Sequence, residues 1–202
     1  MKKLLLTASV LAASAAFATQ ASAAGSLTGQ VTLTGQVTPS CQAGAGDSQS
    51  SSFSQTIALG ELDQADGTLR ADLKASTLAN PSAVFQTEVT CNTLTPKVSV
   101  TATELVDPAL TVKPNYSNAV NYTASAIVTE IGGSDTFSAT TNGAAPGQTG
   151  PTQVSNPIAN QPNNLTIEAY QFSTVGGNGD VLLSSGGAAT YVGVITVDIT
   201  PS

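Results

Sequence analysis

The segment Gly29-Gln-Val-Thr-Leu-Thr-Gly-Gln-Val-Thr-Pro-Ser-Cys41 alternates apolar and polar residues up to a cysteine. Successive side chains of an extended chain point to opposite faces, so this alternation predicts a strand that is buried on one side. One face carries Val31, Leu33, Gly35 and Val37, and the other carries Gln30, Thr32, Thr34 and Gln36. The pattern alone favours an ordinary first strand of the chain's own sheet, and it also fits a strand that is donated to another molecule.

The chain begins with the layout of a secretory signal peptide, which we assign to residues 1–23. Two lysines follow Met1, an apolar run extends from Leu4 to Phe17, and Ala21-Ser-Ala23 supplies the small residues of a cleavage site. The mature chain is expected to begin near Ala24 and to hold about 179 residues. No later segment approaches the roughly 18 consecutive apolar residues of a membrane-spanning helix. We therefore expect export through the periplasm to the cell surface, without membrane insertion.

The composition of the mature chain argues against several partners and favours β structure. Four basic residues stand against 13 acidic ones once the signal peptide is removed, a net charge of −9. Such a surface repels nucleic acid and anionic lipid. Thr and Val suit half-buried pleated surfaces, Gly, Asn and Pro supply turns, and no window of a dozen residues keeps a helical period. We therefore predict one all-β domain.

The chain also lacks the residues on which most hydrolytic and metal chemistry depends. Histidine is absent, which removes most nucleophilic triads and zinc sites. The sequence contains no phosphate-binding loop, dinucleotide fingerprint or Cys-x-x-Cys pair. Glu61, Asp63 and Asp66 cluster in one loop and could act as paired carboxylates in glycoside hydrolysis, but a solvated acidic turn is the favoured interpretation. The stretch Asp63-Gln-Ala-Asp-Gly67 is a candidate calcium loop, but it lacks the closing glutamate of an EF-hand. We expect no enzyme activity, no cofactor and no metal.

Cys41 and Cys91 are the two cysteines of the chain. The predicted signal peptide directs both to a compartment in which disulfides form and persist, so we predict a bridge between them. Such a bridge closes a loop of about 50 residues and stabilises the fold by about 4 kcal/mol on the chain-entropy model.

Further short strands are predicted along the chain, separated by turn signals. They lie at 53–59, 84–91, 97–103, 120–129, 165–172 and 189–200, with one more around 136–139. Val98 and Val100 are expected to face the core. Strands of this number and length indicate a β-sandwich of immunoglobulin-like type. The stretch from 132 to 164 is rich in Gly, Pro, Asn, Thr and Gln, so we interpret it as a long surface insertion.

The last predicted strand, 189–200, carries a strongly apolar face. Tyr191, Ile195, Val197 and Ile199 share that face with Gly193, and Thr196, Asp198 and Thr200 lie opposite. An apolar strand at an open sheet edge exposes unpaired N–H and C=O groups that template another chain. We therefore expect some further strand to pair with it.

Four motifs follow one another in the mature chain. They are Val31-Thr-Leu-Thr-Gly-Gln-Val37 ahead of Pro39-Ser-Cys41, then Ile57-Ala-Leu-Gly60, then Val89-Thr-Cys91, and finally the run from Gly187 to Thr200. In this order and spacing they resemble chaperone–usher pilins, in particular the spore coat protein U type of secreted fimbrial subunit. The resemblance spans most of the mature chain.

The resemblance implies a pilin-type sandwich, residues 39–202, that lacks its final strand and leaves a groove open along its core. Residues 24–38 would be an N-terminal extension that completes the next subunit. The implied donor residues are Val31, Leu33, Gly35 and Val37, and the implied groove-edge residues are Tyr191, Ile195, Val197 and Ile199. The implied partners are identical or related pilin subunits, a periplasmic chaperone and an outer-membrane usher. The implied function is that of a structural subunit of an extracellular fimbria, for surface attachment or biofilm formation.

A second function stays open on the residues themselves. A secreted monomeric β-sandwich could use the 132–164 segment as a displayed loop that binds carbohydrate or another surface. Trp is absent and other aromatic residues are scarce, which leaves few platforms on which a sugar ring could stack. The fibre subunit is therefore the favoured hypothesis.

Overall fold

The computed structural model describes residues 30, 32–44, 49–74, 83–111, 113–143, 146–175, 181–184 and 190–202. The chain forms two compact units, residues 1–36 and 37–202. In the first unit the described residues, 30 and 32–36, are exposed and lie in no strand. The predicted signal peptide and Val31 lie outside the described residues.

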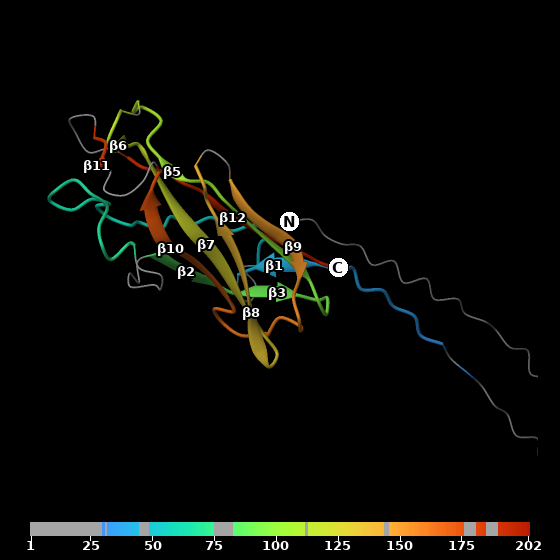
Figure 1. Cartoon of the computed structure of the whole chain (residues 1–202). Helices are drawn as coiled ribbons and strands as arrows, with labels where there is room; N and C mark the ends of the chain where they lie inside the picture. Colours follow the sequence, from blue (N-terminus) through green and yellow to red (C-terminus); the bar gives the residue numbers. More distant parts are fainter. Residues whose placement is uncertain are drawn as a thin grey trace, which may run out of the picture. The chain divides into compact units, whose positions relative to one another are not determined.

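The described residues of the second unit form strands, turns and loops, with no α-helix (Figure 1). The strands are β1 (Cys41–Ala43), β2 (Val84–Thr87), β3 (Val89–Cys91), β4 (Lys97–Ala102), β5 (Leu105–Val106), β6 (Tyr116–Ser117), β7 (Ala119–Glu130), β8 (Gly133–Thr140), β9 (Gly147–Gln153), β10 (Leu165–Thr174), β11 (Val181–Leu182) and β12 (Ile195–Thr200). The predicted all-β class is confirmed. In the part of the chain that is described, no helix has the length and apolar character needed to cross a membrane.

Two antiparallel sheets make up most of the second unit. The larger has the order β2-β10-β7-β5, with β8 also paired to β7, and the other has the order β12-β4-β9. Two small sheets pair β1 with β3 and β6 with β11. The β6–β11 pair is parallel, whereas β1 and β3 are antiparallel.

Side chains from both larger sheets form one buried core. β4 contributes Val98 and Val100 at the alternate positions that the sequence predicts, and their exposed fraction is 0%. β7 and β10 contribute further alternating residues, namely Val120, Tyr122, Ala124, Ala126, Val128, Leu165, Ile167 and Ala169. Alternation with one buried face is what two sheets packed face to face require. The fold is therefore of β-sandwich type.

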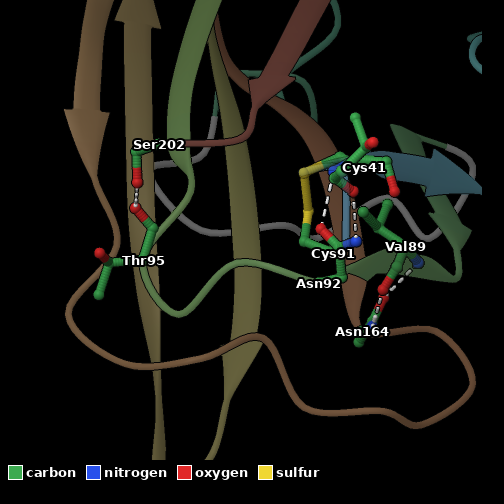
Figure 2. The surroundings of a disulfide bond; sticks show 9 residues. Cys41, Val89, Cys91, Asn92, Thr95, Asn164 and Ser202 are labelled. Atoms are coloured by element: carbon green, nitrogen blue, oxygen red, sulfur yellow. Dashed lines mark hydrogen bonds between the residues drawn. A yellow bond between two sulfur atoms is a disulfide. The ribbon is translucent and has the colours of Figure 1, made fainter. Parts of the chain in front are cut away.

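Cys41 and Cys91 form the predicted disulfide, which joins β1 to β3 (Figure 2). The two cysteines also lie directly opposite each other in the β1–β3 ladder. The buried carboxamide of Asn164 ties β3 to the larger sheet, because it accepts a hydrogen bond from Val89 N (2.7 Å) and donates one to Val89 O (2.7 Å). Since Asn164 directly precedes β10, these contacts link β1, β3 and β10 in series.

The prediction that residues 132–164 form a surface insertion is wrong. This stretch contains β8, which pairs with β7 along its whole length, and β9, which pairs with β4. Phe137, Ala139 and Val154 from this stretch belong to the core. The segment is part of the framework of both sheets, so the alternative binding function loses the displayed loop on which it was based.

Two other predicted strands are divided or shortened. The strand expected at 84–91 is interrupted at Glu88, so that β2 pairs with β10 while β3 pairs with β1. The last strand begins at Ile195 rather than near residue 189, because the residues before it pair with the chain around β5 instead of β4.

Candidate functional site: an open groove beside β12

A groove with a volume of about 850 Å³ lies in the second unit. Two long segments line it, residues 190–200, which we call the β12 wall, and residues 51–57 with Leu59, which we call the opposite wall. The floor consists of apolar core residues, namely Phe85, Val89, Leu105, Tyr122, Ile167, Ala169 and Phe172. Residues Cys41–Ala43 of β1 also line the groove.

The β12 wall is paired along one edge. β12 pairs with β4 from Ile195↔Ala102 to Thr200↔Lys97. None of the described strands pairs with the other edge of β12. That edge therefore presents N–H and C=O groups that an added strand could bind.

The alternation of β12 turns its apolar side chains toward the core. Ile195, Val197 and Ile199 are partly buried, pack against the core and line the groove, whereas the residues between them are exposed. Tyr191 lies on the same wall, and its hydroxyl is 3.2 Å from Ser117 O and 3.0 Å from Leu183 O. The structure thus places all four residues that the resemblance assigns to the groove edge on a single wall.

Gly193 fixes how closely the start of the β12 wall approaches its neighbour. A Cβ atom at this position would lie 2.9 Å from Thr103 O and 3.1 Å from Glu104 O, so a larger side chain would push the two segments apart. Val194 N donates to Thr103 Oγ1 (2.9 Å), and Val194 O accepts from Thr103 N (2.9 Å). Val192 and Val106 exchange backbone hydrogen bonds of 3.0 and 3.1 Å. The glycine therefore permits a close approach of the two segments just ahead of β12.

The opposite wall differs from the strand that the sequence predicts at 53–59. Residues 53–59 belong to no strand, and no hydrogen bond joins their backbone to another described residue. Ile57 and Leu59 nevertheless pack against the core, and the Phe53 ring stacks on Phe85 with 5.7 Å between ring centroids. The side chains of this wall are placed as in a strand, but the strand has no ladder partner. Both long sides of the groove therefore carry unpaired backbone groups.

The floor of the groove is a low-dielectric surface. Tyr122 is 3% exposed, and its ring stacks on Phe172 with 5.6 Å between centroids. Burial raises the pKa of Tyr122 to about 12, because the apolar surroundings disfavour the phenolate. Burial also raises the pKa of Tyr191. A ligand of this floor should itself be apolar, since a charged group would lose its hydration there without gaining a partner.

The predicted donor residues are exposed where they are described. Leu33 is 92% exposed and Val37 is 82% exposed. A Cβ atom on Gly35 would meet nothing within 4 Å. Val31 lies outside the described residues. The donor segment, residues 29–37, thus carries large apolar side chains that are bare in the single chain.

The acidic residues Glu61, Asp63 and Asp66 lie in a loop that bends back on itself through the bridge between Asp63 and Leu69. Among the described residues, no group of three or more His, Cys, Asp or Glu side chains could hold a metal ion. The carboxylate of Asp66 instead accepts hydrogen bonds from Thr68 N (2.9 Å) and Thr68 Oγ1 (2.7 Å), which lower its pKa. This turn is a local hydrogen-bonded structure.

The sequence predicts a strand at 53–59 from the alternation that includes Ile57-Ala-Leu59, but it does not predict that this segment lines the groove. The aromatic floor of the groove was not predicted either. The aromatic floor combines Phe85, Tyr122 and Phe172, which are far apart in the sequence. Their grouping depends on the order of strands in the sheets, which the sequence does not give.

Comparisons of this chain with protein-family models, with curated proteins and with solved structures found no match. The functional assignment therefore rests on the groove and on the donor segment.

Proposed function

We propose that this protein is a structural subunit of an extracellular fimbria that assembles by donor-strand complementation. The donor segment of one copy, residues 29–37, fills the groove of the next copy and pairs with the free edge of β12. The observation that carries the proposal is the groove itself, which has an apolar floor and unpaired backbone groups along both walls. Addition of a strand to an exposed sheet edge is an established mode of peptide recognition.

The donor segment fits the groove in length. Nine residues of extended chain, from Gly29 to Val37, span about 30 Å. The eleven residues of the β12 wall, from 190 to 200, span about 36 Å when extended. The segment is therefore long enough to pair along most of the wall and too short to extend beyond it.

The donor segment also fits the groove in charge. No charged residue occurs between Ala24 and Cys41. Asp198 is the one charged residue among those that line the groove, and it is exposed. Insertion therefore requires no ionised group to lose its hydration, which would be costly in an apolar site. A neutral donor is notable in a mature chain with a net charge of −9.

Burial of the donor side chains supplies the free energy of assembly. Val31, Leu33 and Val37 each contribute about 1.5 to 3 kcal/mol when they move from water into the groove, before the cost of ordering the segment. Gly35 allows the donor backbone to approach the groove closely at one point. The same energetics predict that the open groove needs a cover before assembly, and a periplasmic chaperone followed by an outer-membrane usher would provide it.

The test measures whether the mature chain forms polymers. It compares two variants that each place one negative charge on a different face of the donor segment. Leu33→Asp puts a carboxylate in the groove and should abolish polymers in sedimentation and electron microscopy. Thr34→Asp adds the same charge on the opposite face and should leave assembly nearly unchanged. Polymers of normal length from Leu33→Asp would refute the donor assignment, and so would a wild-type chain that stays monomeric at every concentration.

A second pair of variants tests the close approach at Gly35. Gly35→Phe should block insertion by its bulk, whereas Gln36→Phe places the same ring on the outward face. Both positions are exposed in the single chain, so neither change should alter the unfolding temperature of the monomer. Equal assembly by the two variants would show that the groove does not hold residue 35.

A further inference from the structure

The side chain of Asn92 continues the β1–β3 ladder beyond the last residue of β3. Asn92 N donates to Ser40 O (3.0 Å), and the side-chain oxygen Oδ1 accepts a hydrogen bond from Ser40 N (2.7 Å). The side-chain nitrogen Nδ2 donates to Thr38 O (2.8 Å). The carboxamide thus acts as one more peptide group of β3, and it pairs with the residues just ahead of Cys41 (Figure 2).

Pro39 stiffens the same three residues. Its ring fixes φ of residue 39, and its Cδ atom restricts Thr38 to extended conformations. The Cys41–Cys91 disulfide and the contacts between Asn164 and Val89 anchor the adjoining strands β1 and β3. Asn92 therefore holds residues 38–40 extended through its bonds to Thr38 and Ser40, and the disulfide fixes the residue that follows them, Cys41.

This stiff junction lies beside the chain's own groove. Residues Cys41–Ala43 line the groove, and the donor segment ends four residues before Cys41, at Val37. A tethered segment has an effective concentration of about millimolar at a site that it can reach, so insertion into its own groove would outcompete insertion into a second copy. Residues 38–40 join the donor segment to the groove-lining strand β1, so a donor segment that folds back antiparallel to β1 would have to reverse direction there, as in a tight turn. Those are the residues that Asn92 and Pro39 hold extended.

We infer that Asn92 is a positioning residue that keeps the donor segment out of its own groove and so reserves it for a second copy of this chain. The inference deepens the proposed function and rests on it. Asn92 does not line the groove, and its side chain is exposed, so its effect is exerted through Thr38 and Ser40.

The test compares Asn92→Ala with the wild type in the full mature chain. Loss of two hydrogen bonds at the junction should lower the ratio of polymer to monomer by about tenfold. The monomers that accumulate should hold their own donor segment, so residues 29–37 should resist proteolysis at every protein concentration. Their unfolding temperature should rise above that of a wild-type monomer, whereas a purely structural role for Asn92 predicts a fall.

Two further variants make the comparison decisive. Asn118→Ala removes a similar bond from a side-chain amide to a backbone carbonyl, Asn118 Nδ2 to Leu110 O (3.1 Å), away from the junction, and should assemble like the wild type. Asn92→Asp keeps the acceptor for Ser40 N and loses the donor to Thr38 O, so it should fall between the wild type and Asn92→Ala. It also replaces the alanine variant if that variant fails to fold.

The outcomes separate this inference from the proposed function. If the wild type polymerises and both Asn92 variants polymerise equally well, with a protease-sensitive donor segment, the inference is overturned and the proposed function stands. If the wild type itself never polymerises, both fail.

Discussion

β4 and β12 are neighbouring strands with the same alternation and very different burial. Val100 of β4 and Val197 of β12 lie directly opposite each other in the ladder. Val100 has an exposed fraction of 0%, whereas Val197 is only partly buried. β4 has β12 on one side and β9 on the other, while β12 has a described partner on one side only.

The difference shows that the burial of a strand depends on its neighbours as much as on its own pattern. An apolar face next to an unfilled position in a sheet keeps part of its surface in water, and the adjacent N–H and C=O groups stay unpaired. The groove is therefore a site where one added strand supplies both hydrogen bonds and apolar contacts.

The largest effect is expected at the disulfide that fixes β1 beside the groove. Paired Cys41→Ser and Cys91→Ser substitutions free a loop with a sequence separation of 50 residues. They should lower the free energy of unfolding by about 4 kcal/mol, because the unfolded chain gains entropy. Urea denaturation of the two forms measures this difference. A loss below about 1 kcal/mol would mean that the β1–β3 pair does not constrain the fold.

The next effect is a direct contrast between the two opposing valines. Both substitutions are made in the Leu33→Asp chain, which we call the assembly-blocked monomer. Val100→Ala leaves a cavity in a closed core and should lower the free energy of unfolding of this monomer by about 2 to 3 kcal/mol. Val197→Ala removes the same two methyl groups from a partly exposed site and should cost less than about 1 kcal/mol there. Equal costs in urea denaturation would contradict the contrast between the closed and the open side.

A filled groove should remove that contrast. When a peptide with the sequence of residues 25–37 is added to the assembly-blocked monomer, the cost of Val197→Ala should rise toward that of Val100→Ala. The peptide covers the side chain at 197 and leaves the surroundings of residue 100 unchanged. A peptide that stabilises both variants to the same extent would place its binding site elsewhere.

A smaller effect is expected from Tyr122 in alkaline solution. Its pKa is raised from 10 to about 12 in the folded chain, so the unfolded chain ionises first and stability falls as pH rises above about 10. The loss attributable to this group is about 1 kcal/mol at pH 11. Tyr122→Phe should remove this component of the alkaline loss. Since a donor strand buries the floor further, polymers should show a higher phenolate midpoint in ultraviolet titration than monomers.

The smallest effect is expected from salt. With the predicted signal peptide removed, the chain would carry a net charge of −9, so copies of it should repel one another, whereas the donor segment is neutral. Raising the salt concentration from about 10 to 150 mM shortens the screening length from about 30 to about 8 Å, so assembly should become about two- to threefold faster. Light scattering follows this rate. Slower assembly at higher salt would point instead to ion pairs between subunits.

The sequence predicted those parts of the fold that depend on local alternation. Val98 and Val100 face the core as expected, the two cysteines are bridged, and the inward residues of β12 follow the predicted alternation. Each of these features follows from side-chain spacing or from the number of cysteines. None of them depends on the order of the strands in the sheets.

The sequence failed where strand character comes from a neighbour. β9 reads Gly147-Gln-Thr-Gly-Pro-Thr-Gln153 and has no apolar alternation, yet it forms a strand because it pairs with β4. Residues 53–59 have the alternation and form no strand, because no described segment pairs with them. The groove could therefore not be derived from the local sequence pattern. It exists because no described strand lies between the β12 wall and the opposite wall.

Amide hydrogen exchange on the β12 wall measures whether the outer edge of β12 is open and whether the donor segment pairs with it. The mature Leu33→Asp chain, which cannot donate its own segment, is measured with and without the wild-type peptide of residues 25–37, and a peptide carrying Leu33→Asp is the control. We predict that amides of residues 195–200 that point away from β4 exchange quickly without the peptide and become protected only with the wild-type one. Protection of these amides without any peptide would show that the edge of β12 is already paired, and rapid exchange at saturating wild-type peptide would show that the donor segment does not pair with it.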